Sequence, residues 1–148
     1  MRFGYRDQAT PADWAEVLAT FPLFEGIPKR RLRELVRRAT FAEYGPGDIV
    51  IQSGDRGDSL FVVMSGSAKV TGKPAARPLG TGAYFGELGV LEGVPRSATI
   101  VATDALHVMR LPRRSFLRLA KDDPTIPLKM LGNLGSQIRR LETLPARA

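Results

Sequence analysis

Apolar residues recur at helical spacing near the start of the chain. Thr10 is suited to cap a helix and Pro11 to fill its first turn, and apolar positions then follow every three or four residues. These positions are Trp14, Val17, Leu18 and Phe21. A second apolar stripe follows Pro28 and opposes a face of arginines. Its members are Leu32, Leu35, Val36 and Ala39. The pattern predicts two amphipathic helices within residues 10–40.

From Phe41 onward the spacing changes to short runs of β-favouring residues separated by glycine and aspartate. The runs are FAEY, IVIQ, SLFVVMS, AKVT, SATIVAT and ALHVMRL. They predict antiparallel strands joined by tight turns over residues 41–111. Many short strands at close spacing are typical of a small barrel or a jelly roll. The predicted fold class is therefore mainly β with flanking helices.

Helical spacing returns after Leu111, where Pro112 suits a first turn and Phe116 and Leu119 share one face. This predicted helix ends, and another begins, at Asp122, Asp123 and Pro124. The last helix carries a seam with gaps of three, four and three, made of Leu131, Leu134, Ile138 and Leu141. This seam could meet a partner helix or lie across the barrel.

Composition limits the classes of function. The 148 residues are 43% hydrophobic and 25% charged, which suits one globular domain over residues 1–148. No apolar run approaches the roughly 20 residues of a membrane span, and no secretory signal starts the chain, so we expect a cytoplasmic protein with no transmembrane segment. Without cysteine and with one histidine, we expect no metal site, no cofactor and no enzyme. His107 follows the strand pattern, which favours a structural role.

The net charge of +7 leaves two interpretations open. A basic surface can bind nucleic acid or an anionic membrane. The arginines, however, fall on two predicted helices, which favours solvated helix faces, and a basic ligand pocket accounts for part of the excess. They are Arg30, Arg31, Arg33, Arg37 and Arg38 in the first and Arg113, Arg114 and Arg118 in the second.

One segment between strands has the residues for a specific ligand site. Gly86 has no side chain to block an anion from unpaired backbone N–H groups. Arg96 offers a planar fork of donors for phosphate oxygens, and Ser97 adds a hydroxyl and an N–H group. Glu87 accepts hydrogen bonds only, so it suits a sugar hydroxyl. Together they predict a ligand with both hydroxyl and phosphate groups.

The stretch GELGVLEGVPRSAT resembles the phosphate-binding cassette of the cyclic nucleotide-binding domain family, the type found in the cyclic AMP receptor protein, in cyclic nucleotide-gated channels and in protein kinase A regulatory subunits. PLFEGIPKRRLRELV and YGPGDIVIQSGDRGDSLFVVMSG are also similar to that family, so the likeness spans Phe21 to Leu141. It implies an eight-stranded antiparallel β jelly roll, also called a double-stranded β-helix. The cassette would occupy residues 85–99, and the hinge and lid helices residues 112–142.

The resemblance also implies roles for single residues. Glu87 would accept from the ribose 2′-OH, and Arg96 would pair with the exocyclic phosphate oxygens. Four more would lie against phosphate and ribose: Gly86, Leu88, Ser97 and Ala98. The base would project toward the last helix, whose candidate contacts are Gln137, Ile138, Arg139 and Leu141.

The expected function is binding of a cyclic nucleotide by a regulatory or sensor domain whose C-terminal helices rearrange. We expect cyclic AMP, and Ser97 directly after the arginine keeps cyclic GMP as an alternative. A second alternative is a degenerate family member that serves as a protein-interaction scaffold. Only Glu142 to Ala148 follow the lid, so no DNA-binding domain is expected in this chain, and a homodimer or a partner protein could use the C-terminal helix.

Overall fold

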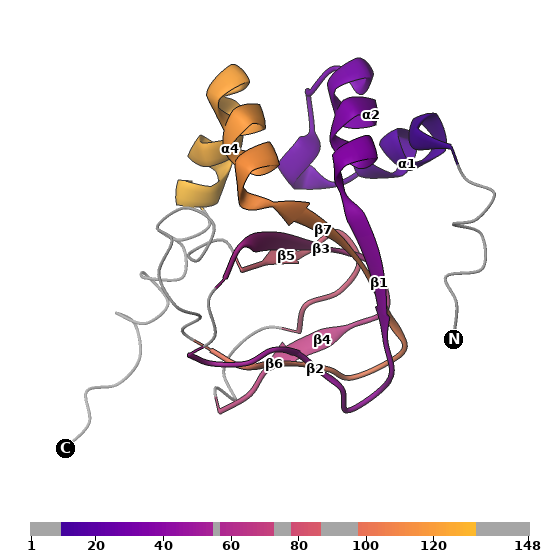
Figure 1. Cartoon of the computed structure of the whole chain (residues 1–148), viewed down its shortest axis with the longest axis vertical. Coiled ribbons are helices and arrows are strands. Elements are labelled where there is room, and N and C mark those ends of the chain that lie inside the picture. The colour runs from indigo at the N-terminus through magenta and orange to yellow at the C-terminus, as the bar shows by residue number, and fades with distance from the viewer. Residues whose placement is uncertain (1–9, 55–56, 73–77, 87–97, 133–148) are drawn as a thin grey trace.

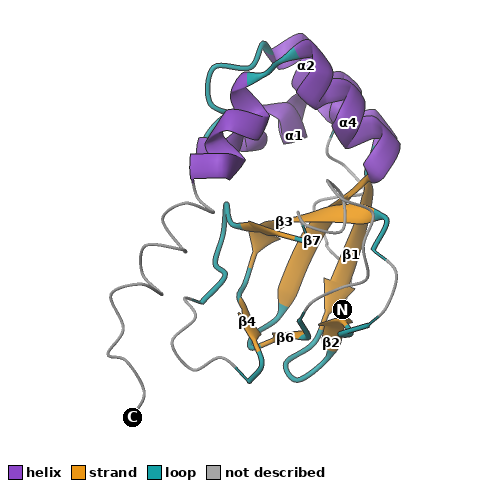
Figure 2. Ribbon diagram, turned by 90° about the vertical axis from the view of Figure 1, so that its left-hand side faces the viewer, coloured by secondary structure: helices purple, strands orange, loops and turns teal. Residues whose placement is uncertain are grey.

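Helices cover one end of two β-sheets. The computed structural model describes residues 10–54, 57–72, 78–86 and 98–132. Figures 1 and 2 show α1, α2 and α4 together above the larger sheet, and the smaller sheet at the opposite end. The antiparallel sheets with flanking helices confirm the general fold class.

The N-terminal helices form where the apolar spacing predicts them. Helix α1 (Pro11–Leu18) begins with a capping box in which Asp13 N donates to Thr10 Oγ1 at 3.2 Å and Thr10 N donates to Asp13 Oδ2 at 2.8 Å. The bond from the Thr10 backbone holds the pKa of the Asp13 carboxyl below its usual value. A short 3₁₀ helix, η1 (Pro22–Phe24), leads into α2 (Lys29–Arg38).

Seven strands lie in the described residues, in place of the predicted eight. Sheet order is β1-β7-β3-β5 in the larger sheet and β2-β6-β4 in the smaller, and all pairs are antiparallel. Leu79 contributes only an isolated bridge to Ala68, and Pro78 beside it has no amide hydrogen with which to extend the ladder. The strands are β1 (Thr40–Tyr44), β2 (Ile49–Ile51), β3 (Ser59–Ser65), β4 (Ala68–Val70), β5 (Tyr84–Phe85), β6 (Ile100–Ala102) and β7 (Leu106–Pro112).

Strand β3 separates two cores, which explains why the run SLFVVMS is apolar at nearly every position. Alternate side chains of a strand point to opposite faces. Leu60 and Val62 face the helices, where they pack with Trp14, while Phe61 and Val63 join the cluster between the sheets. All four are buried.

Helix α4 (Arg113–Asp122) follows β7 directly and buries Phe116 and Leu119 against the helical core. The chain turns at the predicted break, and residues 125–132 are helical. There the Thr125 hydroxyl donates to Asp123 Oδ1 at 2.6 Å, which lowers the pKa of the Asp123 carboxyl. Leu131 of the predicted seam is 61% exposed, and Leu134, Ile138 and Leu141 lie outside the described residues. Among the residues described, no helix is long and apolar enough to span a membrane.

Candidate functional site

The cassette sequence connects the two sheets. It leaves β5, which is the edge strand of the larger sheet, and returns at β6, which is the central strand of the smaller sheet. The described parts that flank it are Phe85–Gly86 on one side and Ala98–Thr99 on the other. Because Phe85 and Ile100 belong to the same buried cluster, both flanks adjoin the core between the sheets.

The first flank is fixed by aromatic packing. Phe85 pairs with Phe61 of β3, and the two rings stack with centroids 5.1 Å apart and planes within 5°. Gly86 follows with φ of +85°, in the left-handed region that residues with a Cβ rarely adopt. It is half-buried. The requirement for glycine at this position is therefore conformational.

Thr99 anchors the second flank to both neighbouring strands. Ser53 N, just after β2, donates to Thr99 Oγ1 at 2.9 Å. Thr71 N, just after β4, donates to Thr99 O at 3.0 Å, and the Thr71 hydroxyl donates to the same oxygen at 3.3 Å. The residue that ends the cassette is thus held at two points, a role that sequence reasoning did not assign to Thr99.

Half-buried apolar residues pack against the same core as these flanks. Val70, Leu79 and Ala83 pack against the core between the sheets and keep part of their surface exposed. Ala68 N donates to Leu79 O at 2.9 Å and Leu79 N to Ala68 O at 2.8 Å, so this short segment is fixed to β4. Ligand sites are commonly lined by apolar groups with a few polar ones. A ribose or a base can cover such a surface.

Arg110 is a cation that sequence reasoning missed. It lies opposite Phe61, which in turn lies opposite Phe85, so one row across β7, β3 and β5 leads from Arg110 to the start of the cassette. The guanidinium carbon is 5.3 Å from the Phe61 ring centroid. Adjacent strands are about 4.8 Å apart, so the backbones of Arg110 and Phe85 lie roughly 10 Å apart. Arg110 shares the face of β7 with Leu106 and Val108, but its position opposite Phe61 follows only from the strand register.

The predicted site residues divide into two groups. Gly86 and Ala98 lie at the two flanks, and both are half-buried. The other ligand contacts, Glu87, Leu88, Arg96 and Ser97, lie outside the described residues, as do the base-contact candidates Gln137, Ile138, Arg139 and Leu141.

His107 lies in β7 opposite Glu43 of β1, with Nδ1 3.9 Å from Glu43 Oε1. The described parts of the chain bring together no group of three or more histidine, cysteine, aspartate and glutamate side chains that could hold a metal ion.

The chain resembles known proteins in sequence. It is 33% identical over 111 residues to a cyclic nucleotide-gated potassium channel of Mesorhizobium japonicum. The aligned region covers 75% of this chain and 31% of the channel. It is also 33% identical over 116 residues to a cAMP-dependent protein kinase regulatory subunit of Mycosarcoma maydis, covering 72% of this chain and 22% of the subunit. The chain thus spans a third or less of these relatives.

The fold has solved counterparts as well. The structure of PKAR CBD2 with Sp-2Cl-cAMPS bound superposes with a TM-score of 0.76 at 26% identity, and the match covers 93% of this chain and 94% of that one. The family model for the cyclic nucleotide-binding domain matches residues 41–123, which include β1 from its second residue, the other six described strands and helix α4. This chain therefore belongs to the cyclic nucleotide-binding domain family.

Proposed function

We propose that this chain binds cyclic AMP and acts as a regulatory domain. The observation that carries the proposal is the position of Gly86: a glycine with left-handed φ follows β5 beside the core between the sheets, where the cassette-like sequence begins. Phosphate binds well to backbone N–H groups that no side chain obstructs. The similar PKAR domain holds a cyclic AMP analogue, which supports this ligand class.

The residues of the cassette suit each part of such a ligand. Arg96 pairs with the exocyclic phosphate oxygens through its planar fork of donors, and Glu87 accepts from the ribose 2′-OH. Gly86 and Ala98 provide backbone against phosphate and ribose, and the anchored Thr99 holds the end of the cassette in place. Val70 and Leu79 cover apolar surface of the ligand.

Titration calorimetry of the full chain tests this proposal. We expect cyclic AMP to bind at one site per chain and more tightly than cyclic GMP. We expect 5′-AMP to bind at least about tenfold more weakly than cyclic AMP, a difference of about 1.4 kcal/mol, because its open phosphate lacks the shape of the cyclic ester. Tighter binding of cyclic GMP would assign Ser97 to guanine contact. Absence of heat with both cyclic nucleotides would favour the scaffold alternative.

Helix α4 is the element that we expect to respond to the ligand. It is joined to the residue before β3 through Arg113 N, which donates to Asp58 O at 2.7 Å, and to α2 through Arg31 Nη1, which donates to Asp122 O at 3.2 Å. Its buried Phe116 and Leu119 can repack if the helix moves. A ligand shifts such an element only by its difference in affinity between the two states.

Hydrogen exchange measures this response directly. With saturating cyclic AMP, we expect amide exchange rates between Arg113 and Gly132 to change by at least about fivefold, since local opening free energies set those rates. Helix α1, which packs on the far side of α2, serves as an internal control and should change little. Equal protection of Arg113–Gly132 with and without nucleotide would contradict the proposed movement.

A further inference from the structure

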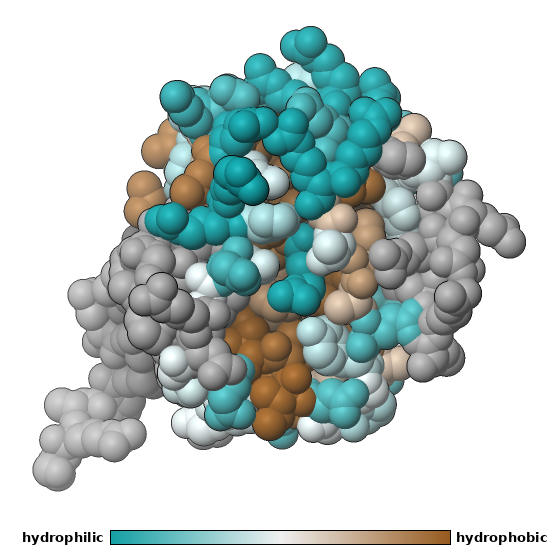
Figure 3. Space-filling model, in the orientation of Figure 1, coloured by the Kyte–Doolittle hydropathy of each residue, from teal (hydrophilic) through white to brown (hydrophobic). Residues whose placement is uncertain are grey.

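The positive charge of the chain is concentrated on two adjacent helices. Helix α2 carries six basic residues and one acidic residue, and α4 carries four basic residues and one acidic residue. Together they have a net charge of +8, against +7 for the whole chain. Figure 3 shows the corresponding field of hydrophilic side chains over the end of the molecule where α2 and α4 lie. The rest of the chain is therefore nearly neutral.

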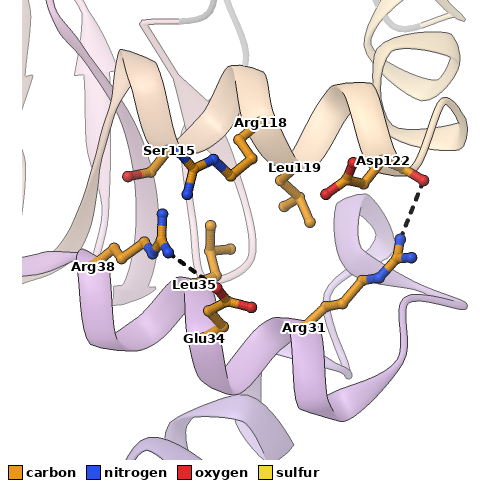
Figure 4. A pocket seen from close by; sticks show the side chains of 8 residues that line it. All are labelled: Arg31, Glu34, Leu35, Arg38, Ser115, Arg118, Leu119 and Asp122. Carbon is orange, nitrogen blue, oxygen red and sulfur yellow. Dashed lines mark hydrogen bonds and ion pairs between the residues drawn. The ribbon is translucent and has the colours of Figure 1, made fainter.

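A groove runs between these helices in the middle of the charged surface. It has a volume of about 70 Å³. Arg31 and Arg38 project into it from α2 and Arg118 from α4, while Leu35 and Leu119 approach each other between them (Figure 4). Both leucines are largely buried, at 4% and 7% exposure, so they form the floor. The groove thus combines three cations with a small apolar floor.

Two of the three cations of the groove are exposed and only weakly paired, while Arg31 also donates to Asp122 O at 3.2 Å. Arg118 is exposed and makes no hydrogen bond or ion pair within the part of the chain that the structure describes. Arg38 pairs with Glu34 at 3.0 Å, but both side chains are well exposed, at 40% and 58%. Exposed ion pairs one helical turn apart are weak, so Arg38 can exchange Glu34 for another carboxylate.

We propose that the groove between α2 and α4 binds an acidic peptide segment of a protein partner. Its carboxylates would pair with Arg31, Arg38 and Arg118, and one small apolar side chain between them would cover Leu35 and Leu119. Guanidinium groups bind carboxylates through two parallel hydrogen bonds, which gives such a contact direction as well as charge.

The two acidic side chains in the groove distinguish this partner from other polyanions. Glu34 and Asp122 lie among the arginines, where they would repel a continuous phosphate backbone or a uniformly anionic lipid surface. A peptide can place its carboxylates next to the cations, and it can place its neutral groups next to Glu34. The cations also surround a small apolar floor, which one side chain of a peptide can cover. The observations therefore favour a peptide.

Fluorescence anisotropy with a defined probe tests the proposal on the full chain without nucleotide. The probe is a fluorescein-labelled, acetylated peptide of sequence Glu-Glu-Leu-Glu-Glu. We expect the double variant Arg31→Glu/Arg118→Glu to weaken its binding at least about tenfold. The matched control is Arg30→Glu/Arg114→Glu, which makes the same charge change at exposed positions of the same helices outside the groove. It should weaken binding by no more than about threefold, because neither side chain lines the groove and the charges of exposed side chains are screened by salt.

Several outcomes would overturn the proposal. Equal losses in the two double variants would show diffuse electrostatic attraction. Undetectable binding of the peptide would show that the groove is not a docking site. Tighter binding of phosphatidylglycerol vesicles or of duplex DNA, with the same dependence on Arg31 and Arg118, would assign the surface to that polyanion. Circular dichroism shows whether the reversed charges of Arg31→Glu/Arg118→Glu unfold the helices. If they do, the neutral double variant Arg31→Gln/Arg118→Gln is tested in its place.

Discussion

Replacing Arg96 with alanine is expected to weaken cyclic AMP binding at least about a hundredfold, equivalent to about 3 kcal/mol. The substitution removes the only guanidinium that the cassette pattern places at the phosphate, so the anion loses its charge-assisted fork of donors. Arg96→Lys keeps the charge and loses the fork, so its affinity should fall between those of the alanine variant and the parent. Titration calorimetry gives all three affinities.

The matched control is Arg37→Ala, which removes an exposed arginine of α2 that is not part of the cassette sequence. It lowers the net charge equally and should change the affinity for cyclic AMP by no more than about twofold, because screening limits the effect of distant surface charges. Thermal melting of both variants separates loss of contact from loss of folding. An Arg96→Ala variant that binds cyclic AMP as tightly as the parent would refute the assigned site.

Helices and buried strands could be predicted from sequence because their signals are local. The stripe that includes Leu32 and Leu35 and the pair Phe116 and Leu119 recur at helical spacing, and both pairs are buried. The run SLFVVMS is long and apolar enough to indicate a strand covered on both faces. Strand β5 is in none of the predicted runs, because its two residues are too few for a period to show.

The residues of the candidate site also differ in whether their signals are local in sequence. The residues expected to bind phosphate and ribose occupy one continuous stretch, so their spacing could be read directly. Thr99 and Arg110 could not be assigned in this way, because their partners are distant in sequence. Thr99 bonds to Ser53, 46 positions away, and Arg110 meets Phe61 through the register of β3 and β7. Such contacts depend on how the strands pair, which alternation alone does not determine.

Replacing Gly66 with alanine is expected to destabilise the protein by at least about 3 kcal/mol, because two costs combine. Gly66 has φ of +88°, a conformation that costs a residue with a Cβ about 1–2 kcal/mol. A Cβ at this position would also overlap the carbonyl oxygen of Ala105 and lie 2.9 Å from Leu106 Cα. Those atoms are backbone and cannot rotate aside. Urea unfolding followed by circular dichroism measures the loss.

Gly47→Ala separates the two costs, because Gly47 has the same φ of +88° and a Cβ there would meet nothing within 4 Å. It should destabilise the protein by only about 1–2 kcal/mol, the conformational cost alone. The additional loss of stability at Gly66 then gives the energetic cost of the contact between a Cβ at this position and the start of β7. Strand β7 pairs with both β1 and β3. Equal losses in the two variants would mean that the backbone at Ala105 moves away, and that this contact does not constrain the centre of the larger sheet.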